Sequence, residues 1–236
     1  MKDKYTGDIG DFTKILLLKK IALINGVRLG INWYFNAKEY AYEKKQCDGK
    51  HTNFLLSQSQ LKNTDERLFY SLLDIIKKEQ RDVEKLHGLI PNGNVLFYKK
   101  QVPYRKTRES WVRESIIDLN NSNLIFLDPD NGIAYSDRTG NVKHVFHADI
   151  ITYYDEKKSL IIYNHKDRYN EEKYKSKINA IIEKLSPQPN IYVLRTRLYS
   201  VRDYIFIIRP ESVPITHKTI DDICLKYPNV FEAYDL

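Results

Sequence analysis

Two hydrophobic patterns alternate along the chain. Short apolar runs bounded by turn residues predict buried strands, and longer segments with apolar residues every three or four positions predict helices. The predicted strands cover residues 28–35, 94–100, 123–128, 159–164, 191–199 and 203–209. The predicted helices cover residues 12–24, 63–87, 107–120, 170–185 and 219–227. We therefore expect an α/β protein.

The order of these elements predicts the layout of the sheet. Strands that alternate with helices favour a mostly parallel sheet flanked by helices on both faces. The last two strands are joined by a short turn near Ser200, so they are expected to form an antiparallel C-terminal hairpin that closes the sheet. Residues 1–236 suit a single domain, with residues 37–62 as a candidate small insertion.

The third predicted strand leads directly into two carboxylates. Asp128, Pro129 and Asp130 follow its four apolar residues and precede the turn pair Asn131-Gly132. Pro129 cannot continue the hydrogen-bond ladder, so the acids lie at the carboxyl end of the strand, where open α/β sheets bind ligands. A strand-ending turn is the alternative interpretation. Because neighbouring carboxylates repel each other, we favour a site with Asp128, Pro129 and Asp130 as catalytic candidates.

Further polar residues follow the next strand. His165 comes directly after residues 159–164 and is the fourth catalytic candidate. The candidates for binding nucleic-acid phosphates are Arg105, Lys106, Arg108 and Arg168. Three of these four belong to the segment 101–108, for which a solvated basic loop is the alternative interpretation.

A glycine-flanked loop precedes the first predicted helix. Gly7 and Gly10 surround Asp8, and Asp11 is a suitable N-cap for the helix that contains Lys14. Capping alone would explain both acids. The functional interpretation is that this loop touches a ligand.

Composition narrows the class of partner. The net charge of +7 and the 18 tyrosines favour nucleic acid, because basic residues attract phosphates and tyrosines stack on bases.

Cys47 and Cys224 form neither a zinc pattern nor a disulfide framework, and the spacing of His144 and His147 lacks a third metal ligand, so no metal site is assigned. No signal peptide precedes the chain and no apolar stretch approaches about 18 residues, so we expect a cytoplasmic protein without a membrane span.

Two segments carry a resemblance to a known family. The run from Asn123 to Asp130 resembles the Asp-Pro-Pro-Tyr type of motif in amino-methyltransferases. The segment from Gly10 to Lys14 is similar to the one before the first strand in bacterial ribosomal-RNA adenine-N6 methyltransferases. The layout thus resembles the Rossmann-like class I methyltransferases that use S-adenosylmethionine. The same segments also resemble a widespread bacterial family, a likeness that implies no function.

The methyltransferase resemblance implies roles for particular residues. Asp128 and the Pro129 carbonyl would accept hydrogen bonds from the exocyclic amine of a base. The neighbours of S-adenosylmethionine would be Asp8, Asp11, Lys14 and Asn36. The chain departs from the family pattern at Asp130-Asn131, which replaces a proline and an aromatic residue, and at residues 36–38, which replace a glycine-rich turn.

Three functions follow from these observations. The preferred one is methylation of an amino group in nucleic acid. The second is a Mg²⁺-dependent nuclease or phosphodiesterase, with Asp128 and Asp130 as magnesium ligands and His165 among the residues facing the phosphate. The missing glycine-rich turn favours this second function over the first. The third is a catalytically inactive scaffold that binds nucleic acid.

Overall fold

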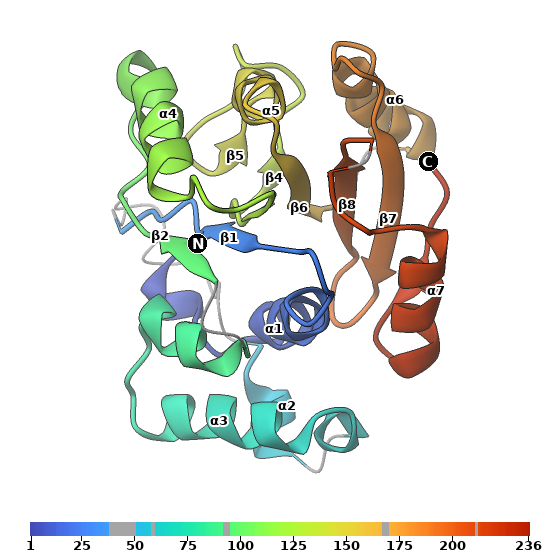
Figure 1. Ribbon diagram of the computed structural model, residues 1–236. Helices are drawn as coiled ribbons and strands as arrows, with labels where there is room; N and C mark the ends of the chain where they lie inside the picture. The colour runs from blue at the N-terminus through green and yellow to red at the C-terminus, as the bar shows by residue number, and fades with distance from the viewer. Residues whose placement is uncertain (38–50, 58–59, 92–94, 167–169, 211) are drawn as a thin grey trace.

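The computed structural model describes residues 1–37, 51–57, 60–91, 95–166, 170–210 and 212–236 (Figure 1). Its main sheet has the strand order β2-β1-β3-β6-β8-β7-β9. These strands are β1 (Leu29–Asn32), β2 (Leu96–Tyr98), β3 (Leu124–Leu127), β6 (Ser159–His165), β7 (Asn190–Thr196), β8 (Arg202–Ile208) and β9 (Glu232–Ala233). The first four run parallel, and β8 lies antiparallel between β6 and β7. The predicted α/β, Rossmann-like layout with antiparallel C-terminal strands is confirmed.

Helices cover both faces of this sheet (Figure 1). One face carries α1 (Ile9–Ile21), α3 (Glu66–Lys77) and α7 (His217–Lys226). The other carries α4 (Arg108–Asp118), α5 (His147–Asp155) and α6 (Glu171–Ile182). The shorter elements are α2 (Asn53–Leu56), the 3₁₀ turns η1 (Asp3–Tyr5), η3 (Gln60–Asn63), η4 (Val83–Leu89) and η5 (Arg105–Thr107), and the paired strands β4 (Gly132–Ile133) and β5 (His144–Val145).

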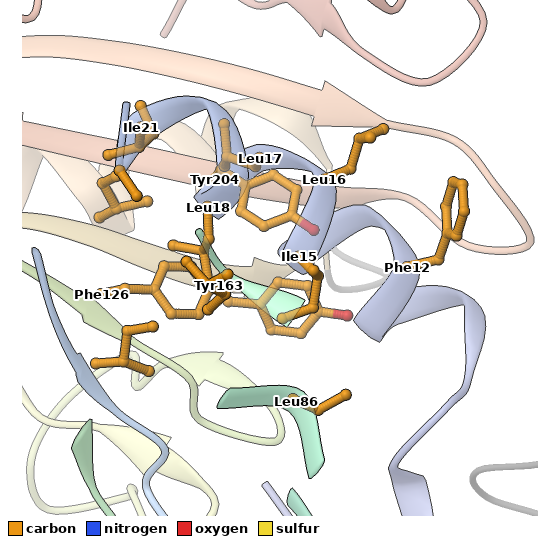
Figure 2. Packing of buried hydrophobic residues seen from close by; sticks show 14 of the residues in the cluster. Phe12, Ile15, Leu16, Leu17, Leu18, Ile21, Leu86, Phe126, Tyr163 and Tyr204 are labelled. Carbon is orange, nitrogen blue, oxygen red and sulfur yellow. The ribbon is translucent and has the colours of Figure 1, made fainter. Parts of the chain in front are cut away.

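The apolar run of β3 is unbroken because both of its faces are buried. Leu124 and Phe126 point into the core beneath α1, whereas Ile125 and Leu127 point into the core beneath α4 and α5. Figure 2 shows Phe126 with residues of α1 and with two tyrosines from β6 and β8. The segment that leads into Asp128 is therefore fixed by packing on two sides.

Several predicted boundaries are wrong for identifiable reasons. Helix α1 starts earlier than predicted because Asp8, and not Asp11, is its N-cap, accepting a 3.0 Å hydrogen bond from the Asp11 amide. The helix predicted over residues 63–87 is split between α3 and η4. Thr107 makes no side-chain capping bond to α4. His144 lies in β5 and His147 in α5, so they do not share a helix face.

None of the helices in the described ranges is long and apolar enough to cross a membrane.

Candidate functional site

A cavity of about 670 Å³ opens where β3 and β6 end. Three carboxylates line it, Asp8, Asp128 and Asp130. Its cationic lining residues are Lys14, Lys143, Lys177 and Arg202, and its histidines are His51, His144 and His165. The carboxyl end of the central strand is thus the place where polar side chains from distant segments meet.

Asp128 is held in place by the backbone and by one lysine. Its amide donates to the carbonyl of Asn32 over 3.0 Å, which continues the pairing of β3 with β1. Only 1% of its surface is exposed, and the ammonium nitrogen of Lys14 lies 2.9 and 3.0 Å from its two carboxylate oxygens. Burial raises the pKa of Asp128, although the positive charge of Lys14 acts in the opposite direction.

Asp130 is the second buried acid of the motif. Its Oδ1 atom is 2.8 Å from the Met1 ammonium, while Oδ2 has no hydrogen-bond partner among the described residues. Asp128 Oδ1 receives no hydrogen bond of good geometry either, although it faces Lys14. Buried carboxylate oxygens normally have partners. Asp130 Oδ2 is therefore the carboxylate oxygen of the motif that has neither a hydrogen bond nor an ion pair among the described residues.

Gly132 positions the turn that follows the two acids. Its φ of +87° is accessible mainly to glycine, and a Cβ atom there would overlap the side chain of Asn164. That close approach lets Asn164 Oδ1 accept a 2.8 Å hydrogen bond from the Ile133 amide. The turn is thus attached to the neighbouring strand β6.

Lys14 connects the acids of the opening loop to those of the motif. Its ammonium lies 3.3 Å from Asp11 Oδ1 and 4.4 Å from the centre of the Tyr163 ring. Burial alone would lower the pKa of Lys14, but Asp128 and Asp11 raise it well above its ordinary value. Burial also raises the pKa of Asp11 to about 7, and the second oxygen of Asp11 accepts a bond from the Gly7 amide. Asp11 therefore fastens the loop, whereas Asp8 and Lys14 line the cavity.

His165 and Arg202 are direct partners across β6 and β8. Burial, with the positive charges of Arg202 and Lys14, lowers the pKa of His165 to about 3. Burial and the positive charge of Lys177 likewise lower the pKa of His144 to about 4. Both imidazoles are therefore neutral at pH 7 and each carries one donor and one acceptor.

The segment after β1, where the resemblance expects a glycine-rich turn, carries buried aromatic residues instead. Trp33 and Tyr34 follow β1 and are completely buried, and the Met1 ammonium donates to the Tyr34 carbonyl over 3.1 Å. Asn36 is buried against Gln101 and does not line the cavity. Of the four residues that the resemblance places beside the cofactor, Asp8 and Lys14 line the cavity, whereas Asp11 and Asn36 do not.

Of the four residues predicted to bind phosphates, the structure describes the side chains of Arg108 and Lys106, and neither lines the cavity. Arg108 is buried and binds Asp149 through two nitrogens, at 2.7 and 3.1 Å, so it stabilises the junction of α4 and α5. Lys106 is exposed on η5 and does not line the cavity. The side chain of Arg105 and the whole of Arg168 lie outside the described residues.

Several lining residues were not predicted from the sequence. They are Tyr5, His51, Tyr135, Lys143, His144, Tyr163, Lys177 and Arg202. Arg202 had a detectable signal, because an antiparallel strand placed beside β6 brings the start of that strand next to His165. The others depend on how loops and α6 fold over the strand ends, which no local pattern indicates.

In the parts of the chain that the structure describes, no group of three or more His, Cys, Asp or Glu side chains is placed to hold a metal ion.

A scan of family models finds no match for this chain, and searches of curated proteins and of solved structures find none either.

Proposed function

We propose that this protein is an enzyme that acts on nucleic acid and hydrolyses a phosphodiester bond. The observation that carries the proposal is the pair of buried carboxylates, Asp128 and Asp130, in a cavity that also contains cations, with Asp130 Oδ2 receiving no hydrogen bond from the described residues. Carboxylates orient and deprotonate a water molecule, and cations attract the phosphate. The net charge of +7 supports an anionic polymer as the substrate.

Each acid has a distinct role in this proposal. Asp130 accepts a proton from the water that attacks phosphorus, and the departing sugar oxygen takes up a proton as its bond to phosphorus breaks. Asp128, paired with Lys14, keeps the turn and the adjacent cavity wall in place. His165 is neutral and donates or accepts a hydrogen bond at the phosphate.

The two carboxylates of the motif are also the kind of group that binds a magnesium ion. Magnesium binds proteins through one or two carboxylates and completes its octahedron with water and substrate phosphate. Asp128 and Asp130 would hold it, and the bound ion would polarise the phosphate.

Cleavage of labelled single-stranded RNA and DNA tests this proposal. We expect wild-type protein to cut at least one of them, and Asp130→Asn to lower the rate by about 100-fold or more. The matched control is Asp74→Asn, since Asp74 is an exposed acid of α3 that pairs with Lys78. Equal rates for the wild type and Asp130→Asn would contradict the assignment.

Methylation of an amino group in nucleic acid is a second candidate, supported by one specific observation. The antiparallel insertion of β8 between β6 and β7 is the arrangement that the class I methyltransferase resemblance implies. Asp128 and Pro129 also line the cavity, where they could accept hydrogen bonds from a base amine. The buried aromatic residues after β1 are the reason why this reaction is placed second.

A nucleic-acid-binding scaffold without chemistry is the third proposal. It differs from the other two because substitution of either acid would leave nucleic-acid binding and cellular function unchanged. In all three proposals the protein acts in the cytoplasm.

A further inference from the structure

Arg202 is a buried cation whose charge is not paired within the described chain. Only 4% of its surface is exposed. One terminal nitrogen donates to the carbonyls of Leu198 and Ser200, at 3.0 and 3.5 Å, in the turn between β7 and β8. Its Nε atom has no hydrogen-bond partner among the described residues. The turn therefore orients the guanidinium but leaves a donor and a full charge without a counterpart.

A buried, unpaired guanidinium is costly unless an anion completes it. Among the described acids, none lies within ion-pair distance of Arg202, whereas the buried Arg195 and Arg108 are each paired with an aspartate. All three guanidinium groups are buried, and Arg202 differs from the other two because it lines the cavity. The missing anion is thus expected from the cavity side.

The surroundings of Arg202 suit a phosphate. His165 is its partner across β6 and β8, and as a neutral imidazole it offers one N–H donor. Lys177 from α6 is also buried, with its ammonium 4.7 Å from the centre of the Tyr135 ring. Guanidinium groups bind phosphate through directed hydrogen bonds, and Lys177 adds positive charge to the wall of the same cavity.

We propose that Arg202, with His165, forms a subsite for the phosphate group of a nucleotide. The inference rests on the proposal that the cavity binds nucleic acid, but not on the reaction proposed there. It assigns the phosphate to the strand β8 side of the cavity, and leaves Asp130 to the reacting bond. The basic loop at residues 101–108 has no part in this subsite.

Calorimetric titration with AMP and with adenosine tests the subsite. We expect AMP to bind wild-type protein at least tenfold more tightly than adenosine, and Arg202→Gln to weaken AMP binding roughly ten- to hundredfold without changing adenosine binding. Arg197→Gln is the matched control, because Arg197 lies beside the same turn but is exposed and pairs with Glu232. AMP binding that is no tighter than adenosine binding, or that Arg202→Gln leaves unchanged, would overturn the inference.

Two further arms complete the design. If Arg202→Gln does not fold, Arg202→Lys keeps the charge but removes the Nε donor, and it should still weaken AMP binding. A 5′-phosphorylated trinucleotide and its 5′-hydroxyl form show which phosphate occupies the subsite. If the hydroxyl form binds more weakly, the subsite takes the terminal phosphate. If both forms bind equally and Arg202→Gln abolishes the binding, the subsite takes an internal phosphate. If AMP binding depends on Arg202 but no oligonucleotide is cleaved, only the hydrolysis proposal is overturned. If oligonucleotides are cleaved but AMP binding does not depend on Arg202, only the subsite is overturned.

Discussion

Lys14 and Asp128, 114 positions apart in the chain, form a buried ion pair at the carboxyl end of the central strand. The pair ties the first helix to the strand that presents the acidic motif. Both side chains are almost fully enclosed, so their charges depend on each other and not on solvent.

This dependence predicts a large effect on stability. Lys14→Met leaves Asp128 and Asp11 as buried acids without their shared cation, and we expect the free energy of unfolding to fall by about 3 kcal/mol or more. Chemical denaturation measures this change. The control is Lys78→Met on the exposed pair with Asp74, which should cost less than about 1 kcal/mol. Similar losses in the two variants would contradict the buried pair.

The turn after the acids gives a second prediction. Gly132→Ala requires a strained φ of +87° and a displaced Asn164 side chain, so the free energy of unfolding should fall by about 1–3 kcal/mol. Gly88→Ala is the control, because no neighbouring atom lies within 4 Å of an added Cβ there, and its effect should stay within about 0.5 kcal/mol. A Gly132→Ala protein as stable as the control would show that the turn is not constrained as described.

The neutral histidines predict a dependence of stability on pH. The folded-state pKa of His165 is lowered to about 3, so as the pH falls below about 6.5 the unfolded chain binds a proton that the folded protein does not. Stability is therefore fully present above that pH and is lost on acidification, by up to about 1.4 kcal/mol per pH unit for this histidine.

Denaturation of His165→Gln between pH 7 and about pH 4 measures this contribution. The variant should lose stability less steeply than wild-type protein. Parallel pH profiles for the wild type and His165→Gln would disagree with a neutral imidazole at this position.

Local patterns in the sequence were sufficient to predict the sheet and the position of the acids. The runs before Asp128 and His165 are apolar on both faces because helices cover both sides of their strands. This burial is visible in the sequence as uninterrupted apolar residues. Helix boundaries were less accurate, because Asp8 and Asp11 are both acceptable caps and only the three-dimensional structure selects one. The break between α3 and η4, within the helix predicted over residues 63–87, likewise depends on tertiary packing.

Most of the cavity could not be predicted, because its residues come together through contacts between distant segments. Arg202 reaches His165 only because β8 pairs with β6 as well as with β7. Conversely, Arg108 belongs to a basic segment, yet its buried bond to Asp149 removes it from the surface. Charge along the sequence does not reveal which cations are already paired.

The most direct test of the central claim is mass spectrometry of an RNA and a DNA oligonucleotide after incubation with the protein, Mg²⁺ and S-adenosylmethionine. We predict fragments whose combined mass exceeds that of the substrate by one water molecule, formed by wild-type protein and by Asp74→Asn but not by Asp130→Asn. An intact oligonucleotide that has gained a methyl group would contradict hydrolysis and favour the second candidate. An unchanged oligonucleotide would contradict both reactions and favour the scaffold.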